Sequence, residues 1–381
     1  MRRRWFPLLA GAALTAAPAV LAAQSPDSEP PASHWSLDVP VHGYGISFGN
    51  AARFAGLRFN LEDDDLDRIA GINVTLWRPG KHVTGRVDGL AVGVVGPAAG
   101  ELNGISIGLV GTLATRHLSG VAVSGLGVVS QGDVTGISVA GLGVVAQGEM
   151  RGLNLSGLGV VAEGGMSGAG LAGLGVVAEG SMHGIDLAGL ATVAQGDMVG
   201  GFVSGLATVA QGGLRGITAS GLASVAQGDL WGAHAAGLAV VSQGDITGLV
   251  AAGLATVAQG NISGLAASGL AVVAQGRVSG LSLAGLAVVA QGGTRGITVA
   301  GYRVQGPQAS GITVAGLYLD VRGMRGLSVG AYNRVRGLQA GISIGLLNYA
   351  RVLHGLQLGV INIARNNPAP FRVLPLLNAH F

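Results

Sequence analysis

The chain has 381 residues, of which 70 are glycine, none is cysteine and only 11% are charged. A soluble globular protein carries about 25% charged residues and about 7% glycine, so this composition disfavours an ordinary globular enzyme. The missing Gly-X-Y period excludes collagen, and a hydrophobic content of 49% excludes intrinsic disorder. The formal net charge of +3 includes Arg2, Arg3 and Arg4, in a segment that we expect to be removed. The remainder has 19 basic (22 − 3) and 19 acidic residues, which gives no support for a polyanionic partner.

Residues 1–23 are predicted to form a signal peptide. Arg2 to Arg4 supply a positive start, an apolar run rich in Leu and Ala follows, and small residues at Ala22 and Ala23 suit cleavage. The alternative is an uncleaved membrane anchor, because the apolar run approaches spanning length. Residues 24–40, which are rich in Pro and Ser at their start, are expected to be a disordered lead-in. We therefore expect an exported protein, located in the cell envelope, the outer membrane or on the extracellular surface.

Residues 120–295 are eleven copies of one 16-residue repeat without insertion or deletion. With the first glycine of each copy as position 1, positions 1, 6 and 13 are always Gly, position 7 is always Leu and position 10 is always Val. Position 12 is Gln in nine copies and Glu in two, and position 15 is apolar in ten. Positions 3, 14 and 16 vary freely. We expect the fixed positions to be packed and the free positions to face solvent.

The period favours a parallel β-solenoid with one coil per repeat. Common helical repeats need about 33 residues or more, and three glycines per copy would each cost a helix roughly 1 kcal/mol. Segments such as Gly136-Ile-Ser-Val-Ala alternate large and small residues with the period of a strand. The three glycine columns are expected to mark three bends at positive φ. The Gln column is expected to stack its amides into a ladder.

The alternative architecture is an antiparallel outer-membrane β-barrel. Export, high mean hydropathy and the alternation of Phe371, Val373, Leu377 and Phe381 in the last segment favour it. Barrels, however, alternate short and long turns and carry aromatic girdles. Here consecutive repeats share the same Gln-Gly turn and contain only Phe202 and Trp231 as aromatic residues, so the solenoid is preferred.

Both flanks contain degenerate versions of the repeat. These are residues 41–119 and 296–365, and residues 366–381 are expected to form a C-terminal cap, because terminal coils must cover exposed edges. Gly337-Leu-Gln-Ala-Gly and Gly355-Leu-Gln-Leu-Gly-Val-Ile-Asn-Ile-Ala resemble the G-L-Q-x-G-L-x-N-x-A units of bacterial surface-repeat proteins. The resemblance covers only about residues 326–381. It implies an exported or surface location, and no functional residue is carried over from it.

The sequence predicts no catalytic, cofactor-binding or metal site. Ser106 and Ser343 match G-x-S-x-G, but both lie in strand segments without the strand-to-helix turn that a nucleophile elbow needs. Gly168-Ala-Gly170-Leu-Ala-Gly173 matches G-x-G-x-x-G only because the repeat has Gly at position 3. We interpret these matches as coincidences of a glycine-rich repeat.

The titratable residues give no site either. The eight histidines show no metal-ligand spacing, and His183 and His234 are expected to be solvated. The acidic cluster Asp63, Asp64, Asp65 and Asp67 is interpreted as a solvated loop, and the acidic residues at position 14 form an interrupted stripe. A single lysine, Lys81, gives no basic tract for nucleic acid.

The expected function is therefore that of an exported, non-enzymatic repeat protein, which acts as a cell-surface scaffold or a binding or adhesion surface. The expected partners are an envelope membrane, a cell-wall polymer or another copy, with no nucleic acid and no identified small-molecule substrate. No cofactor is expected. The barrel alternative would instead make the protein an outer-membrane pore or structural membrane protein.

Overall fold

The computed structural model describes residues 35–41 and 44–381. The expected signal peptide, residues 1–23, lies outside the described residues. The described chain is all β and divides into two compact units, which comprise residues 35–148 with 153–161, and residues 149–152 with 162–381. No helix in this part of the chain is long and apolar enough to cross a membrane.

The N-terminal unit is built mainly from long strands that pair in parallel from β2 onward. Its strands are β1 (Ser36–Val41), β2 (Tyr44–Gly49), β3 (Arg53–Asp63), β4 (Arg68–Pro79), β5 (Arg86–Gly93), β6 (Ala98–Gly108), β7 (Gly111–Ser124), β8 (Gly127–Ser130), β9 (Asp133–Ala140) and β10 (Gly143–Ala146). The strands β11 (Met150–Ser156) and β12 (Gly159–Ala162) fall at the division between the units. Ser36–Pro40, expected in the disordered lead-in, instead belong to β1, because β1 pairs antiparallel with β2.

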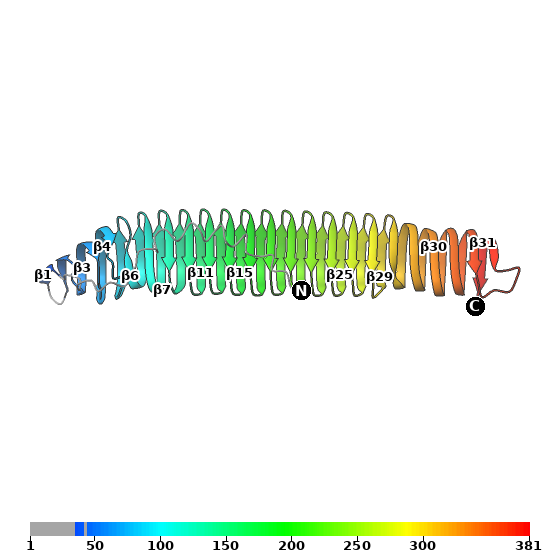
Figure 1. Cartoon of the computed structure of the whole chain (residues 1–381), viewed down its shortest axis with the longest axis horizontal. Coiled ribbons are helices and arrows are strands. Elements are labelled where there is room, and N and C mark those ends of the chain that lie inside the picture. The colour runs from blue at the N-terminus through cyan, green and yellow to red at the C-terminus, as the bar shows by residue number, and fades with distance from the viewer. Residues whose placement is uncertain (1–34, 42–43) are drawn as a thin grey trace. The chain divides into compact units, whose positions relative to one another are not determined.

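As far as residue 300, the C-terminal unit is a parallel β-solenoid of 16-residue coils, as predicted, and Figure 1 shows its long and short strands standing side by side. Each coil pairs a seven-residue strand and a four-residue strand with the equivalent strands of the next coil, so that Met166 pairs with Met182 and Gly175 with Ala191. This parallel register excludes the antiparallel alternative for these coils. The long strands are β13 (Met166–Ala172), β15 (Met182–Ala188), β17 (Met198–Ser204), β19 (Leu214–Ser220), β21 (Leu230–Ala236), β23 (Ile246–Ala252), β25 (Ile262–Ser268), β27 (Val278–Ala284) and β29 (Thr294–Ala300).

The short strands occupy positions 8 to 11 of the coils. They are β14 (Gly175–Ala178), β16 (Ala191–Ala194), β18 (Ala207–Ala210), β20 (Ala223–Ala226), β22 (Ala239–Ser242), β24 (Ala255–Ala258), β26 (Ala271–Ala274) and β28 (Ala287–Ala290). The chain then continues through β30 (Arg303–Ala364), which bends at the positive-φ glycines of successive coils, and ends with β31 (Val373–His380). β31 pairs antiparallel with the end of β30, so it closes the last coil in the region expected to form the cap.

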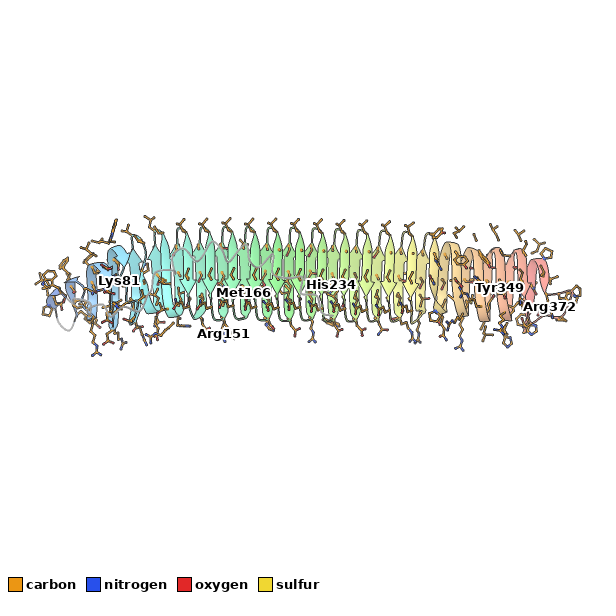
Figure 2. All side chains as sticks on the ribbon, in the orientation of Figure 1. Lys81, Arg151, Met166, His234, Tyr349 and Arg372 are labelled. Carbon is orange, nitrogen blue, oxygen red and sulfur yellow. The ribbon has the colours of Figure 1, made fainter. Side chains whose placement is uncertain are left out.

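The core is lined by positions 3, 5, 9, 11 and 15, so one expectation from the repeat pattern is wrong. Variable position 3 is buried, as Phe202 (0% exposed) and His234 (2%) show, whereas invariant Leu206 at position 7 is 44% exposed. Figure 2 shows Met166 and His234 within the coils and Arg151 pointing outward. Position 3 tolerates variation because each inward side chain meets its counterparts in the adjacent coils, which vary too.

The three glycine columns have two different causes. Only position 1 has positive φ, for example +123° at Gly216, whereas positions 6 and 13 in these coils do not. Position 6 instead requires glycine for space, because a Cβ on Gly221 would lie 1.9 Å from the carbonyl oxygen of Gly205. The expectation of three positive-φ bends is therefore corrected to one such bend and two close backbone approaches.

An amide ladder exists, but in a different column from the predicted one. The Gln side chains at position 12 are exposed. In β30, by contrast, the amide of Asn333 donates to Oδ1 of Asn348, and Asn348 donates to Oδ1 of Asn362, both at 2.8 Å. These three side chains are buried. Buried amides stack because each one satisfies its neighbour where water is absent.

Candidate binding surface

One face of the C-terminal unit is apolar because positions 2 and 4 of the long strands point outward. Ile217 is 67% exposed, Leu249 56% and Val203 48%. Alternation along a strand places these side chains opposite the core residues at positions 3 and 5. The outward set is apolar, whereas the inward set includes polar residues such as Ser204 and His234, so hydrophobicity alone does not identify the buried face.

The bend beside this face carries a row of leucines at position 7. The backbone positions the row: the amide of each leucine donates to the carbonyl oxygen of the leucine one coil earlier, at 2.8 Å between Leu190 and Leu174 and again between Leu222 and Leu206. The side chains are 44–52% exposed. We call this set the leucine row; within the C-terminal unit it comprises Leu174, Leu190, Leu206, Leu222, Leu238, Leu254, Leu270 and Leu286.

Between positions 4 and 6 the surface is hollowed into a shallow apolar groove. Its floor consists of the position 4 alanines of four consecutive coils, Ala219, Ala235, Ala251 and Ala267. Larger side chains at the same position, Val203 and Leu283, stand at its ends. The apolar face therefore varies in height along the unit.

Charge lies at the opposite bend and at position 16, the second residue of each long strand. Among residues 162–295, all but one of the charged residues occupy positions 12, 14 or 16, and the exception, Asp186, is only 3% exposed. The acidic side chains at position 14 of that bend also stabilise the fold. Oδ1 of Asp229 accepts from the backbone N–H of Asp245 at 2.8 Å, and Oδ1 of Asp245 accepts from Asn261 at 2.6 Å. The position 14 stripe thus caps backbone amides of the next coil.

These caps add to the backbone approach at position 13, where a Cβ on Gly228 would lie 2.8 Å from the backbone N of Gly213. A Cβ on Gly244 would lie 2.2 Å from Oδ1 of Asp229, so the carboxylate occupies the space that a side chain would fill. The sequence shows the glycine column at position 13 beside the acidic residues at position 14. That the two columns depend on each other is visible only in the contact between neighbouring coils.

The two matches to the nucleophile elbow lie in the core. Ser106 in β6 is 4% exposed, and Ser343 in β30 is fully buried with its Oγ 2.8 Å from that of Ser328. An elbow presents an exposed hydroxyl at a strand-to-helix turn, which neither serine has. Gly170 of the G-x-G-x-x-G match also faces inward, beside Asp186.

The acidic cluster of the N-terminal unit is not wholly solvated. Asp63 is 1% exposed and its Oδ1 accepts from Nη1 of fully buried Arg58 at 2.6 Å. Asn60, Asn73 and Thr75 donate to the same carboxylate. The expectation of a solvated loop is therefore wrong for Asp63, because the buried Arg58, five residues earlier in β3, requires a buried anion. Asp67 is exposed and pairs with Arg53.

Two titratable side chains lie inside the regular coils. Burial raises the pKa of Asp186 to about 6, while a backbone hydrogen bond from Gly170 opposes the shift. Burial likewise lowers the pKa of His234, and its Nδ1 lies 2.9 Å from Oγ1 of Thr218. The expectation that His234 is solvated is wrong, because position 3 faces the core; His183 at position 16 is exposed as expected.

Within residues 35–41 and 44–381, no group of three or more His, Asp or Glu side chains is placed to hold a metal ion. No protein-family model, curated protein or solved structure matches this chain. The fold and the surface chemistry are therefore the basis for a functional proposal.

Proposed function

We propose that this protein is an exported, non-enzymatic scaffold of the cell envelope that lies against a membrane surface through the apolar face of its regular coils. The observation that carries the proposal is the leucine row. Leucine is invariant at position 7 although its side chain is about half exposed, whereas the buried position 3 varies from Gly to Phe. Core packing therefore does not account for the invariance.

The surroundings of the row support an apolar partner. Positions 2 and 4 add exposed Ile, Leu and Val, and between Gly168 and Ala290 no charged residue occupies position 2, 4 or 7. Eight coils at a strand spacing of about 4.8 Å extend such a surface for roughly 38 Å. Large continuous apolar patches of this kind mark membrane or protein contact sites.

The apolar face has an uneven surface, which a fluid partner fits better than a rigid one. Position 2 alternates small and large residues, as in Gly201, Ile217, Ala233 and Leu249, and the alanine groove adds a second depression. A rigid partner must match each depression to avoid voids, since voids forfeit packing contacts. Acyl chains fill an uneven surface without such matching. We therefore favour a membrane over a second copy of the chain.

The test is flotation of the full mature chain with neutral phosphatidylcholine vesicles. In the variant L222E/L254E, two charges interrupt the leucine row; in the control Q227E/Q259E, the same coils receive the same charges on the opposite bend, where Glu occurs naturally at Glu179. We expect the wild type and the control to float and the leucine variant to remain in solution, with all three showing the same β circular dichroism spectrum.

Failure of the wild type to float would contradict membrane binding. Concentration-dependent dimerisation that L222E/L254E abolishes would assign the face to a second copy instead. Export is tested separately, by determining the N-terminus of the protein from the producing cell and by carbonate extraction of its envelope. A mature chain beginning near residue 24 in the carbonate extract is expected; an intact N-terminus in the cytoplasm would overturn the exported scaffold.

A further inference from the structure

The last coils have a charge distribution that differs from that of the regular coils. Residues 301–381 contain eight arginines and one acidic residue, Asp320, for a net charge of +7 (8 − 1) with neutral His. Residues 162–300 contain three arginines and six acidic residues, for a net charge of −3 (3 − 6). The near-zero balance of the whole chain therefore conceals a basic segment.

Three of these arginines form a row along successive coils. Arg336, Arg351 and Arg365 each lie ten residues after the positive-φ glycine of their coil, which are Gly326, Gly341 and Gly355. The backbone amide of Arg365 donates to the carbonyl oxygen of Ala350 at 3.1 Å, which places Arg365 in register with Arg351. All three side chains are exposed. We call them the arginine row; its members are one coil apart, which is about 4.8 Å.

The charges of the row are largely uncompensated. Arg336 pairs with Asp320, whose Oδ1 accepts from Nε at 2.8 Å. The side chain of Arg351 makes no hydrogen bond or ion pair with any residue in the described part of the chain, and Arg365 contacts a tyrosine rather than an acid. Like charges on adjacent strands repel one another. An anionic ligand bound along the row would relieve this repulsion between the guanidinium groups, so the row is suited to bind one.

Tyrosines beside the row hold neighbouring guanidinium groups against their rings. The Cζ of Arg365 lies 5.8 Å from the ring centroid of Tyr349, and that of Arg303 lies 5.5 Å from the ring centroid of Tyr318. Tyr332 packs on Tyr318, with 5.2 Å between ring centroids. Cation–π contact limits the freedom of a guanidinium while leaving its N–H fork available for carboxylates. Arg365 occupies one face of Tyr349, and both Arg303 and Tyr332 contact Tyr318, which leaves less ring surface for stacked bases.

We propose that the arginine row binds a linear acidic polysaccharide through the carboxylates along its chain. Arg351 and Arg365 offer planar N–H donors to carboxylates one coil apart, and Arg336, whose Nε and Nη2 bind Asp320, extends the positive charge by one coil. Such a row matches a polymer that repeats its anionic group along its chain. The row occupies the bend that corresponds to position 12 in the regular coils, whereas the proposed membrane face uses positions 2, 4 and 7. The inference therefore does not depend on the proposed function, and both surfaces can be occupied together.

The test compares binding of the full mature chain to polygalacturonate and to neutral dextran by isothermal titration calorimetry. The variant R336Q/R351Q/R365Q replaces the row with the residue that the regular coils carry at this bend, so the fold is expected to persist. The control R215Q/R277Q/R295Q removes the same number of charges from regular coils. We expect the row variant to lower affinity for polygalacturonate by about a hundredfold, the control to retain affinity, and dextran not to bind.

Three outcomes would overturn the proposal. Equal losses in the two triple variants would show a general charge effect rather than a site. No binding of polygalacturonate by the wild type would exclude the polymer class. Tighter, row-dependent binding of single-stranded DNA or of vesicles containing phosphatidylglycerol would assign the row to nucleic acid or to lipid phosphates instead. Thermal unfolding of each variant checks that the coils remain intact.

Discussion

Gly170 and Asp186 occupy the same inward position in neighbouring coils, and a Cβ on Gly170 would lie 2.4 Å from Oδ1 of Asp186. The absence of a side chain in one coil thus makes room for a carboxylate in the next. The backbone N–H of Gly170 also donates to this carboxylate. Variation at position 3 is therefore coupled between coils, although each residue alone looks unconstrained.

This pair predicts a conditional effect of Gly170→Ala. Alanine is compatible with position 3 itself, since Ala266 occupies it elsewhere. The substitution should nevertheless destabilise the protein by roughly 2 kcal/mol, because the methyl group displaces Asp186. In an Asp186→Ala background the same change should cost much less, and a double-mutant cycle of thermal or denaturant unfolding measures the difference. Equal costs in both backgrounds would contradict the coupling.

Asp186 also predicts a pH dependence of stability. Its pKa is raised by burial from 3.8 to about 6, so the folded state holds the proton more tightly than the unfolded state. Stability from this group is therefore highest below pH 4 and is lost as the pH rises through 6, by up to about 3 kcal/mol. Asp186→Asn should remove this component, as measured by unfolding at pH values of about 4.5 and about 7.5. An unchanged pH profile in the Asn variant would refute the assignment.

Two adjacent glycines predict opposite results when each is replaced by alanine. Gly200 has φ +139°, and a Cβ there would lie 1.9 Å from the carbonyl oxygen of Gly184. Gly201 has only Ile185 within reach of a Cβ, at 3.9 Å. Gly200→Ala should cost about 3 kcal/mol or more, whereas Gly201→Ala should be neutral or slightly stabilising. Similar unfolding midpoints for the two variants would contradict the placement of the bend.

Burial predicts that a variable residue matters more for stability than an invariant one. Phe202 is fully buried, so Phe202→Ala should cost about 3–5 kcal/mol through the cavity it leaves. Leu206 is 44% exposed, so Leu206→Ala should cost less than about 1 kcal/mol. Denaturant unfolding of the two variants checks the order, and a reversed order would place position 7 in the core.

The asparagine ladder predicts a difference between two amides. Asn348 is buried between Asn333 and Asn362, so Asn348→Ala leaves the Oδ1 of Asn362 without its donor and should cost about 2 kcal/mol. Gln275→Ala removes an exposed amide of the regular repeat and should change stability little. Local amide hydrogen exchange in β30 measures the first effect, and equal exchange in both variants would argue against the ladder.

Several features of the fold could be predicted from the sequence because they depend on spacing. The uninterrupted 16-residue period, the position 15 apolar column and the glycine columns together indicate stacked β coils, since only stacking of identical units keeps such a register. The Asn residues that form the ladder were visible in the degenerate repeats near Asn348, but their burial was not. The local net charge of residues 301–381 could also have been read from the sequence, and averaging over the whole chain concealed it.

The repeat period alone predicts the coil length, the strand segments and their parallel stacking. The side of each strand that faces the core depends instead on the folded coil. Strand alternation defines two sets of residues but does not say which set is inward when both are apolar, as Leu249 and Val250 are. The inward set is chosen by the closure of the coil, where small residues at position 5 meet position 9 of the short strand, as Ser204 and Thr208 do at 3.1 Å between their hydroxyl oxygens. That choice buries Phe202 and His234 and leaves the leucine row on the surface.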